Sequence, residues 1–178
     1  MGEKLKIVLQ EKNIEMELYT ARDNMVQECR GCGKCFDEGL CPQDRADSMG
    51  CIREKILEAD LIVLLSPVYL NNVSGAMKTF LDRIGSWVHT LQLSGKIGIV
   101  VTVTDQSGQE FVTYYLQKIL SHMGCNVVGE YKVVALEGLG QEEVVERIVS
   151  NIVKAFSEQE QYKSTGDLEK LFQYTKER

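Results

Sequence analysis

Four cysteines lie close together near the start of the chain, at a spacing that suits a metal cluster. They are Cys29, Cys32, Cys35 and Cys41. Iron-sulfur clusters are held by cysteine thiolates, and the bacterial ferredoxin pattern has three cysteines at steps of three residues and a further cysteine followed by proline. This chain keeps those steps and the proline, Pro42, although five residues separate the last two cysteines. The pattern therefore predicts a [4Fe-4S] cluster on this loop.

Other uses of these thiols remain open on the sequence alone. Zinc sites usually combine two separated cysteine pairs, so overlapping steps favour iron-sulfur over zinc. A disulfide framework suits the chain less well, because 178 residues need no cross-links and we expect no secretory leader. Free cysteines in a loop are the plain alternative. Cys51 could replace one ligand, whereas we expect Cys125, beside an apolar run, to pack in the core.

The composition describes a globular chain of one ordinary domain. Of its 178 residues, 44% are hydrophobic and 26% charged, and no apolar run approaches the roughly 20 residues that span a bilayer. The formal net charge of -6 argues against nucleic-acid binding, which usually needs a concentrated basic face. We therefore expect a cytoplasmic protein whose partners are small molecules or proteins, with no membrane or nucleic acid among them.

The elements that position the cysteine loop alternate between helix and strand, which is typical of an α/β fold with a parallel sheet covered on both faces. Apolar spacing predicts helices over residues 5–9, 48–57, 74–84, 111–123 and 145–156, with Ser48 and Ser74 as caps. We predict strands over residues 14–19, 61–65, 97–103 and 127–136, with 61–65 buried on both faces. Residues 1–156 then form the domain. Residues 157–178 are a polar tail with a short helix at 168–174, for which we expect a role in oligomer contacts.

Ligands of open parallel sheets bind beyond the carboxyl ends of the strands. The loops that follow the strands are the cysteine run, residues 66–75 and residues 102–110, and we expect all three to converge on one edge. The Tyr69 ring suits either stacking on a flat ligand ring or an ordinary half-buried position. The helix that we expect to begin at residues 107–109 has a partly positive N-terminus, which favours an electron-rich acceptor. The expected cofactor contacts are Ser66, Pro67, Val68, Tyr69, Asn71, Ser74, Thr102, Asp105, Ser107, Gly108 and Gln109.

Two of these segments carry a recognisable pattern. Ser66-Pro67-Val68-Tyr69, followed by Ser74-Gly75-x-Met77-Lys78-x-Phe80-x-Asp82-Arg83, resembles the signature of flavodoxin-like NAD(P)H-dependent FMN reductases. With the cysteine run, the chain is similar to the iron-sulfur flavoprotein branch over residues 14–156. The resemblance implies a flavodoxin-like, three-layer, doubly wound sheet and a homodimer or homotetramer. It also implies that the chain binds FMN, with residues 66–69 lining the isoalloxazine ring and residues 102–109 covering its other side. The implied source of electrons is NAD(P)H or the cluster.

One part of the family pattern is missing. Family members begin with a central strand and a loop whose amides cradle the FMN phosphate. This chain starts at Met1 with residues that align with the helix after that loop, so we expect neither the first strand nor the phosphate loop. The absent strand would lie between residues 14–19 and 61–65. Binding of FMN by the chain alone is therefore left open.

Three functions follow from the sequence. The first is an FMN-dependent redox protein that also carries the cluster on Cys29, Cys32, Cys35 and Cys41. The second is a cluster-free NAD(P)H-dependent FMN or quinone reductase with free cysteines. The third is a degenerate flavodoxin-like module that has lost FMN and serves as a binding or assembly subunit. We assign no catalytic acid or base, because flavin carries the redox step itself, and we expect Asp82 and Arg83 to anchor local structure.

Overall fold

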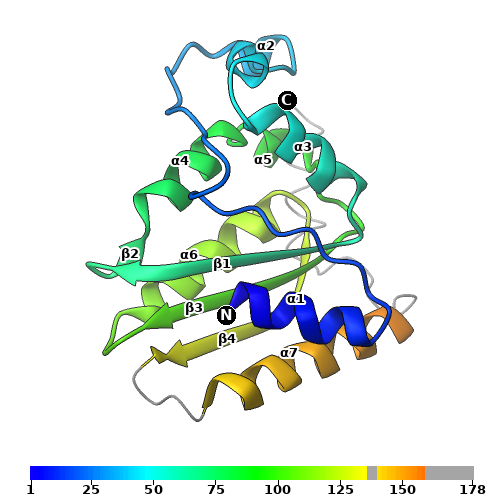
Figure 1. The fold of residues 1–178 in the computed structure, drawn as a ribbon. Helices are drawn as coiled ribbons and strands as arrows, with labels where there is room; N and C mark the ends of the chain where they lie inside the picture. The colour runs from blue at the N-terminus through cyan, green and yellow to red at the C-terminus, as the bar shows by residue number, and fades with distance from the viewer. Residues whose placement is uncertain (136–139, 159–178) are drawn as a thin grey trace.

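The computed structural model describes residues 1–135 and 140–158, which fold around a four-stranded sheet (Figure 1). The strands are β1 (Leu61–Tyr69), β2 (Asn72–Val73), β3 (Ile97–Thr104) and β4 (Asn126–Val134), in the order β2-β1-β3-β4. β1, β3 and β4 are parallel, and β2 pairs antiparallel with the end of β1. The predicted parallel α/β sheet is therefore confirmed.

Helices cover both faces of the sheet, so the molecule has three layers. The helices are α1 (Gly2–Glu11), α2 (Lys34–Asp37), the 3-10 helix η1 (Pro42–Arg45), α3 (Met49–Glu58), α4 (Gly75–Arg83), α5 (Trp87–Thr90), α6 (Gln109–His122) and α7 (Gly140–Ser157). Figure 1 shows α1 and α7 in front of the sheet and α6 behind it. Apolar residues of α1 and α7 form one core cluster with β3 and β4, and residues of α3 to α6 form the other.

The two central apolar strands differ in burial. In β3, Ile99, Val100 and Val101 are all fully buried, as a strand with helices on both faces should be. In β1, Ile62 and Leu64 are buried, while Leu61, Val63 and Leu65 are only half-buried. The expected burial of residues 61–65 on both faces is therefore wrong. The reason is position: β1 pairs with β3 through residues 61–67 and with β2 only at residues 68–69, so its other edge has no strand partner among the described residues.

Residues 14–19 do not form the predicted strand. The alternation is present, because Ile14, Met16 and Leu18 are half-buried while Glu15 and Glu17 are exposed. However, the segment has no partner in the sheet. An alternating pattern predicts an extended backbone with two unlike faces, but a strand also needs a neighbour that accepts its backbone hydrogen bonds. Among the described residues, this segment lacks that neighbour.

The five helices predicted within residues 5–156 are confirmed, with two differences in detail. Ser74 caps α4 as expected, since its Oγ accepts a hydrogen bond from the Met77 N–H at 3.2 Å. Ser48 precedes α3 but makes no capping bond, and Asp47 Oδ1 instead accepts from the Met49 N–H at 3.0 Å. Phe111 is 66% exposed, because it lies one step outside the stripe of α6 that the sheet covers.

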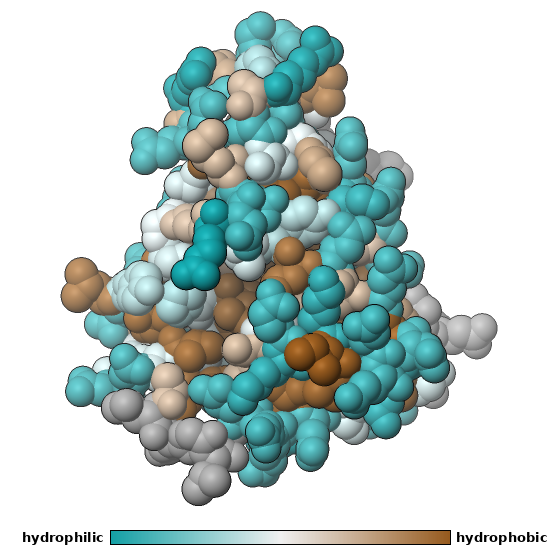
Figure 2. Space-filling view, viewed as in Figure 1, coloured by the Kyte–Doolittle hydropathy of each residue, from teal (hydrophilic) through white to brown (hydrophobic). Residues whose placement is uncertain are grey.

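Two further expectations concern regions beyond the core. Among the helices of the described ranges, none has the length and apolarity needed to span a membrane. On the face shown in Figure 2, hydrophilic residues predominate, and the hydrophobic residues gather mainly where the sheet and α1 lie. The predicted tail helix at 168–174 lies outside the described residues.

Candidate cofactor site at the sheet edge and the cysteine loop

A tight hairpin closes the carboxyl end of β1. Leu70 and Asn71 both have positive φ, 51° and 60°, which is the backbone of a two-residue hairpin turn between β1 and β2. Such turns usually carry asparagine and glycine, and a leucine in this conformation is strained. Leu70 is nevertheless 100% exposed, and Tyr69 beside it is 62% exposed. Strained residues that gain no buried contact are often found at binding sites, and the Tyr69 ring is accessible for stacking.

The loop before α6 meets this hairpin at Gly108. A Cβ atom built on Gly108 would lie 2.3 Å from Asn71 Oδ1 and 3.2 Å from Asn71 Cα, so any other residue here would force Asn71 to shift. Gly108 also has a φ of 90°, which disfavours any other residue. The loop is closed by Thr104, whose Oγ1 donates to the Ser107 carbonyl at 3.0 Å. The segments 66–75 and 102–110 therefore adjoin at one edge of the sheet, as predicted.

Several of the predicted contact residues have hydroxyl groups that are used inside the protein. Ser66 is fully buried, and its Oγ donates to the Pro67 carbonyl at 2.9 Å and accepts from the Ser74 N–H at 3.3 Å. Thr102 is also fully buried and shares a 2.9 Å hydrogen bond with Thr113. These buried hydroxyl groups therefore stabilise the conformation of the two segments. The exposed residues at the edge are Tyr69, Asn71, Asp105 and Ser107, and the half-buried ones are Pro67, Val68, Ser74 and Gln109.

Substitution of Gly108 tests this close approach. We expect Gly108→Ala to destabilise the protein by clearly more than Gly95→Ala, because Gly95 has a similar φ of 82° but no atom within 4 Å of its Cβ position. The φ penalty alone is about 1 kcal/mol. Gly75→Ala, with neither constraint, should change stability little. Urea unfolding of the three variants measures the difference, and equal losses for Gly108→Ala and Gly95→Ala would contradict the contact with Asn71.

The cysteine loop does not converge with the other two loops as expected. Figure 1 shows it beyond α3, α4 and α5, at the end of the molecule away from α7. Phe36 of this loop packs edge-on against His89 of α5, with 5.3 Å between ring centroids. The prediction failed because residues 14–19 are not in the sheet, so the chain that follows them does not start from its carboxyl edge.

The four loop thiols are accessible but are not gathered into a ligand set. Cys29 and Cys32 are exposed, and Cys35 and Cys41 are half-buried. Nowhere in ranges 1–135 and 140–158 do three or more His, Cys, Asp or Glu side chains come close enough together to hold a metal ion. The loop does contain three glycines with positive φ, at residues 31, 33 and 39, and each has open space around its Cβ position.

The remaining cysteines lie outside the loop. Cys125 is fully buried, and burial raises the pKa of its thiol to about 12. Its Sγ donates to the Lys96 carbonyl at 3.3 Å. The prediction of a packed core thiol is confirmed. Cys51 is exposed on α3.

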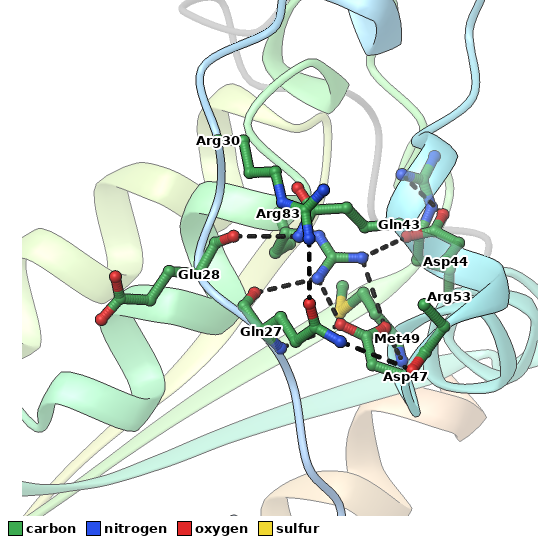
Figure 3. A network of polar contacts seen from close by, with 10 residues as sticks. Gln27, Glu28, Arg30, Gln43, Asp44, Asp47, Met49, Arg53 and Arg83 are labelled. Carbon is green, nitrogen blue, oxygen red and sulfur yellow. Dashed lines mark hydrogen bonds and ion pairs between the residues drawn. The ribbon is translucent and has the colours of Figure 1, made fainter.

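The base of the cysteine loop is held by one buried arginine (Figure 3). Arg83 is 2% exposed and donates to the Gln27 carbonyl at 2.9 Å and to Asp44 Oδ1 at 2.7 Å. It also forms an ion pair with Asp47, whose side chain is fully buried. Arg83 was expected to anchor local structure. Its partners instead lie 36 to 56 residues away in the chain, and a single sequence carries no signal that could have identified them.

The pKa of Asp47 is moved in opposite directions by its surroundings. Burial alone would raise it, but hydrogen bonds from Arg83 and from the Gln27 and Met49 N–H groups hold it below its ordinary value. A carboxyl whose pKa is lowered on folding stabilises the protein above its unfolded pKa. That contribution is lost as pH falls through the lowered value.

Acid should therefore weaken the base of the loop. As pH falls below about 4, Asp47 should contribute a loss of at most about 1.4 kcal/mol of unfolding free energy per pH unit, because one proton is taken up. Urea unfolding of wild type and Asp47→Asn across roughly pH 3 to 6 isolates this loss as a difference in slope. Identical slopes for the two proteins would refute the assignment.

Comparison with known sequences gives two kinds of match. The sequence model of the NADPH-dependent FMN reductase family matches residues 1–138. An iron-sulfur flavoprotein of Archaeoglobus fulgidus is 34% identical over 122 residues, which are 68% of this chain and 54% of the relative. A second iron-sulfur flavoprotein of that organism is 28% identical over 173 residues, which are 89% of this chain and 87% of the relative.

Comparison with solved structures addresses the fold. The crystal structure of RosB, which holds a formylriboflavin phosphate intermediate, aligns with a TM-score of 0.70 at 23% identity and covers 98% of this chain and 78% of RosB. At this identity the likeness shows the fold, and the predicted flavodoxin-like α/β architecture is confirmed. The chain spans 54% and 62% of the length of two curated iron-sulfur flavoproteins that it matches.

Proposed function

This chain belongs to the NADPH-dependent FMN reductase family, and we propose that it is an oxidoreductase whose electrons pass through FMN and a [4Fe-4S] cluster. The observation that carries the proposal is the family match over residues 1–138, which contains both the cysteine run and the 66–83 motif. The names of the matched iron-sulfur flavoproteins support the cluster. In this proposal NAD(P)H or a ferredoxin-like protein is the donor, and the acceptor is a small molecule or a protein.

The residue types of the hairpin and of the loop before α6 suit the binding of a flat ring. Tyr69 is accessible beside this edge, and Gly108 leaves the backbone open where the two segments meet. The first turn of α6 starts at the same place, and its partial positive charge favours an electron-rich carbonyl. FMN would supply the redox chemistry, so the residues of this edge need only bind and orient its ring. We assign no residue to the FMN phosphate.

The cluster half of the proposal rests on ligand type and spacing. Cys29, Cys32, Cys35 and Cys41 lie on one accessible loop, and thiolates are the ligands that iron-sulfur clusters use. As the thiols are arranged in the structure, they do not fit around a cluster. Binding therefore requires the loop to rearrange, and the glycines at residues 31, 33 and 39 have open space around them.

The separation of the thiols supports a second candidate function. An NAD(P)H-dependent FMN or quinone reductase with free cysteines would need the same flavin edge and no gathered ligand set. In that function the cysteine loop takes no part in electron transfer. Removal of a loop thiol therefore separates the two candidates.

Anaerobic FMN titration of the purified chain tests the shared part of both candidates. We expect stoichiometric flavin binding, followed by loss of the visible flavin absorbance when NADPH, NADH or reduced ferredoxin is added. Failure to retain FMN would overturn both candidates and favour a module that has lost flavin. In Cys35→Ala, flavin reduction by nicotinamide should persist. Transfer of electrons onward should be lost only if the cluster is part of the path.

A further inference from the structure

We propose that Arg83 is a positioning residue that fastens both ends of the cysteine loop to the end of α4. On the entry side, Arg83 Nη1 donates to the carbonyl of Gln27, two residues before Cys29. On the exit side, Arg83 binds Asp44, three residues after Cys41, and also Asp47. One guanidinium thus joins two segments that the whole loop separates.

The ion pairs of Arg83 lie largely buried in the protein. The side chains of Arg83 and Asp47 are both fully buried, and that of Asp44 is 16% exposed. A buried ion pair loses its water and is tolerated only where hydrogen bonds replace that water. Arginine suits the position because its planar fork can reach several acceptors at once, which lysine cannot do. Burial alone would lower the pKa of Arg83, but hydrogen bonds to Asp47 and Asp44 raise it.

A second arginine completes the charge balance at the loop base. Arg53 of α3 lies 3.4 Å from Asp44, and its guanidinium stacks over the Trp87 ring at 5.2 Å from the centroid. The two arginines therefore face two carboxylates, Asp44 and Asp47, in a nearly dry environment. Loss of either partner would leave a buried charge without compensation.

Further hydrogen bonds join the two stems of the loop directly (Figure 3). Gln43 Nε2 donates to the Glu28 carbonyl at 3.1 Å, and the Gln27 N–H donates to Asp47 at 2.9 Å. The Ser48 N–H donates to the Met25 carbonyl at 3.0 Å. The base is therefore fixed while the thiol-bearing part, residues 29–41, is accessible and rich in glycine. Rearrangement of the thiols can occur without moving the base.

The same helix connects the loop to the sheet edge. α4 begins at its Ser74 cap, and the Ser74 N–H donates to Ser66 Oγ at the end of β1. α4 ends at Arg83, so one short helix runs from the hairpin segment to the loop base. The inference does not depend on the proposed function, because every atom in it belongs to the chain without any cofactor.

Arg83→Lys is the test variant, because it keeps the charge and removes the fork. In the metal-free full chain we expect amide hydrogen exchange at Gln27 and Ser48 to accelerate about tenfold or more. Alkylation of the half-buried Cys35 and Cys41, followed by mass spectrometry, should accelerate similarly. Cys125 is the internal control: it is buried in the core, so its alkylation rate should stay at the wild-type value.

Lys78→Gln is the matched control, since Lys78 forms an exposed ion pair with Asp82 on the same helix. In Lys78→Gln, the amides of Gln27 and Ser48 should exchange at the wild-type rate. The proposal is overturned if Arg83→Lys leaves the amides of Gln27 and Ser48 unchanged, or if Cys125 accelerates as much as the loop thiols, which would indicate general unfolding. If Arg83→Lys does not fold, Asp44→Asn removes the charge of one of the two exit-side partners of Arg83 and leaves Asp47 and Gln27 in place. Local acceleration at Cys41 without Cys125 would then support the proposal, and its absence would overturn it.

Discussion

Replacing Arg83 with methionine is expected to lower the free energy of unfolding by about 3 to 5 kcal/mol. Methionine fills much of the same space but leaves the buried Asp47 without its cation, and it removes one of the two arginines beside Asp44, where Arg53 remains. It also leaves the Gln27 carbonyl without its side-chain donor. Two uncompensated groups beneath one loop are a more severe change than the loss of a surface ion pair. Urea unfolding of the cofactor-free chain measures the effect.

A double-mutant cycle separates this loss from a general packing defect. Asp47→Asn removes the second charge, so the double variant Arg83→Met with Asp47→Asn should be more stable than the sum of the single losses by about 1 to 3 kcal/mol. Lys78→Met removes an exposed ion pair on the same helix and should cost no more than about 0.5 kcal/mol. Additive losses at Arg83 and Asp47 would contradict the coupling described above.

Removal of one loop thiol is expected to abolish the cluster. After anaerobic reconstitution of the proposed holoprotein, Cys35→Ala should fall from about four irons per chain to fewer than one, because a cubane needs four protein ligands. The protein should remain folded, since Cys35 lies on the accessible part of the loop and the base contacts do not involve it. Iron and sulfide assays measure the loss, and circular dichroism checks the fold.

Cys51→Ala is the matched control for this experiment. Cys51 is exposed on α3, outside the loop, so its removal should leave the iron content unchanged. Full iron content in Cys35→Ala together with loss of iron in Cys51→Ala would indicate that Cys51, and not Cys35, is the fourth ligand. Full iron content in both variants would show that these thiols do not bind the cluster.

Local patterns predicted most of the fold. The apolar run at residues 97–103 predicted the strand β3, and the Ser74 cap predicted where α4 begins. Both depend on neighbours in sequence, which is why they can be read without a structure. The meeting of the hairpin with the loop before α6 was also expected, because parallel strands that follow one another end at the same edge.

The failures have a common physical cause, which is the need for a distant partner. Residues 14–19 show the alternation of a strand, but no strand in the described part of the chain pairs with them. The position of the cysteine loop depended on that strand, so the expected convergence of three loops failed with it. Arg83 was recognised as an anchor, yet its partners Gln27, Asp44 and Asp47 lie in a different part of the sequence. Such contacts are set by the tertiary fold and leave no local pattern.

The most direct measurement is an assay of iron, sulfide and flavin on one anaerobically prepared sample of the chain, with its visible absorption spectrum. We expect about one flavin and about four irons with matching sulfide per chain, and flavin absorbance that disappears when the donor is added. Flavin without iron would support a reductase function and contradict the presence of the cluster. A sample with neither flavin nor iron, even after reconstitution, would contradict the account.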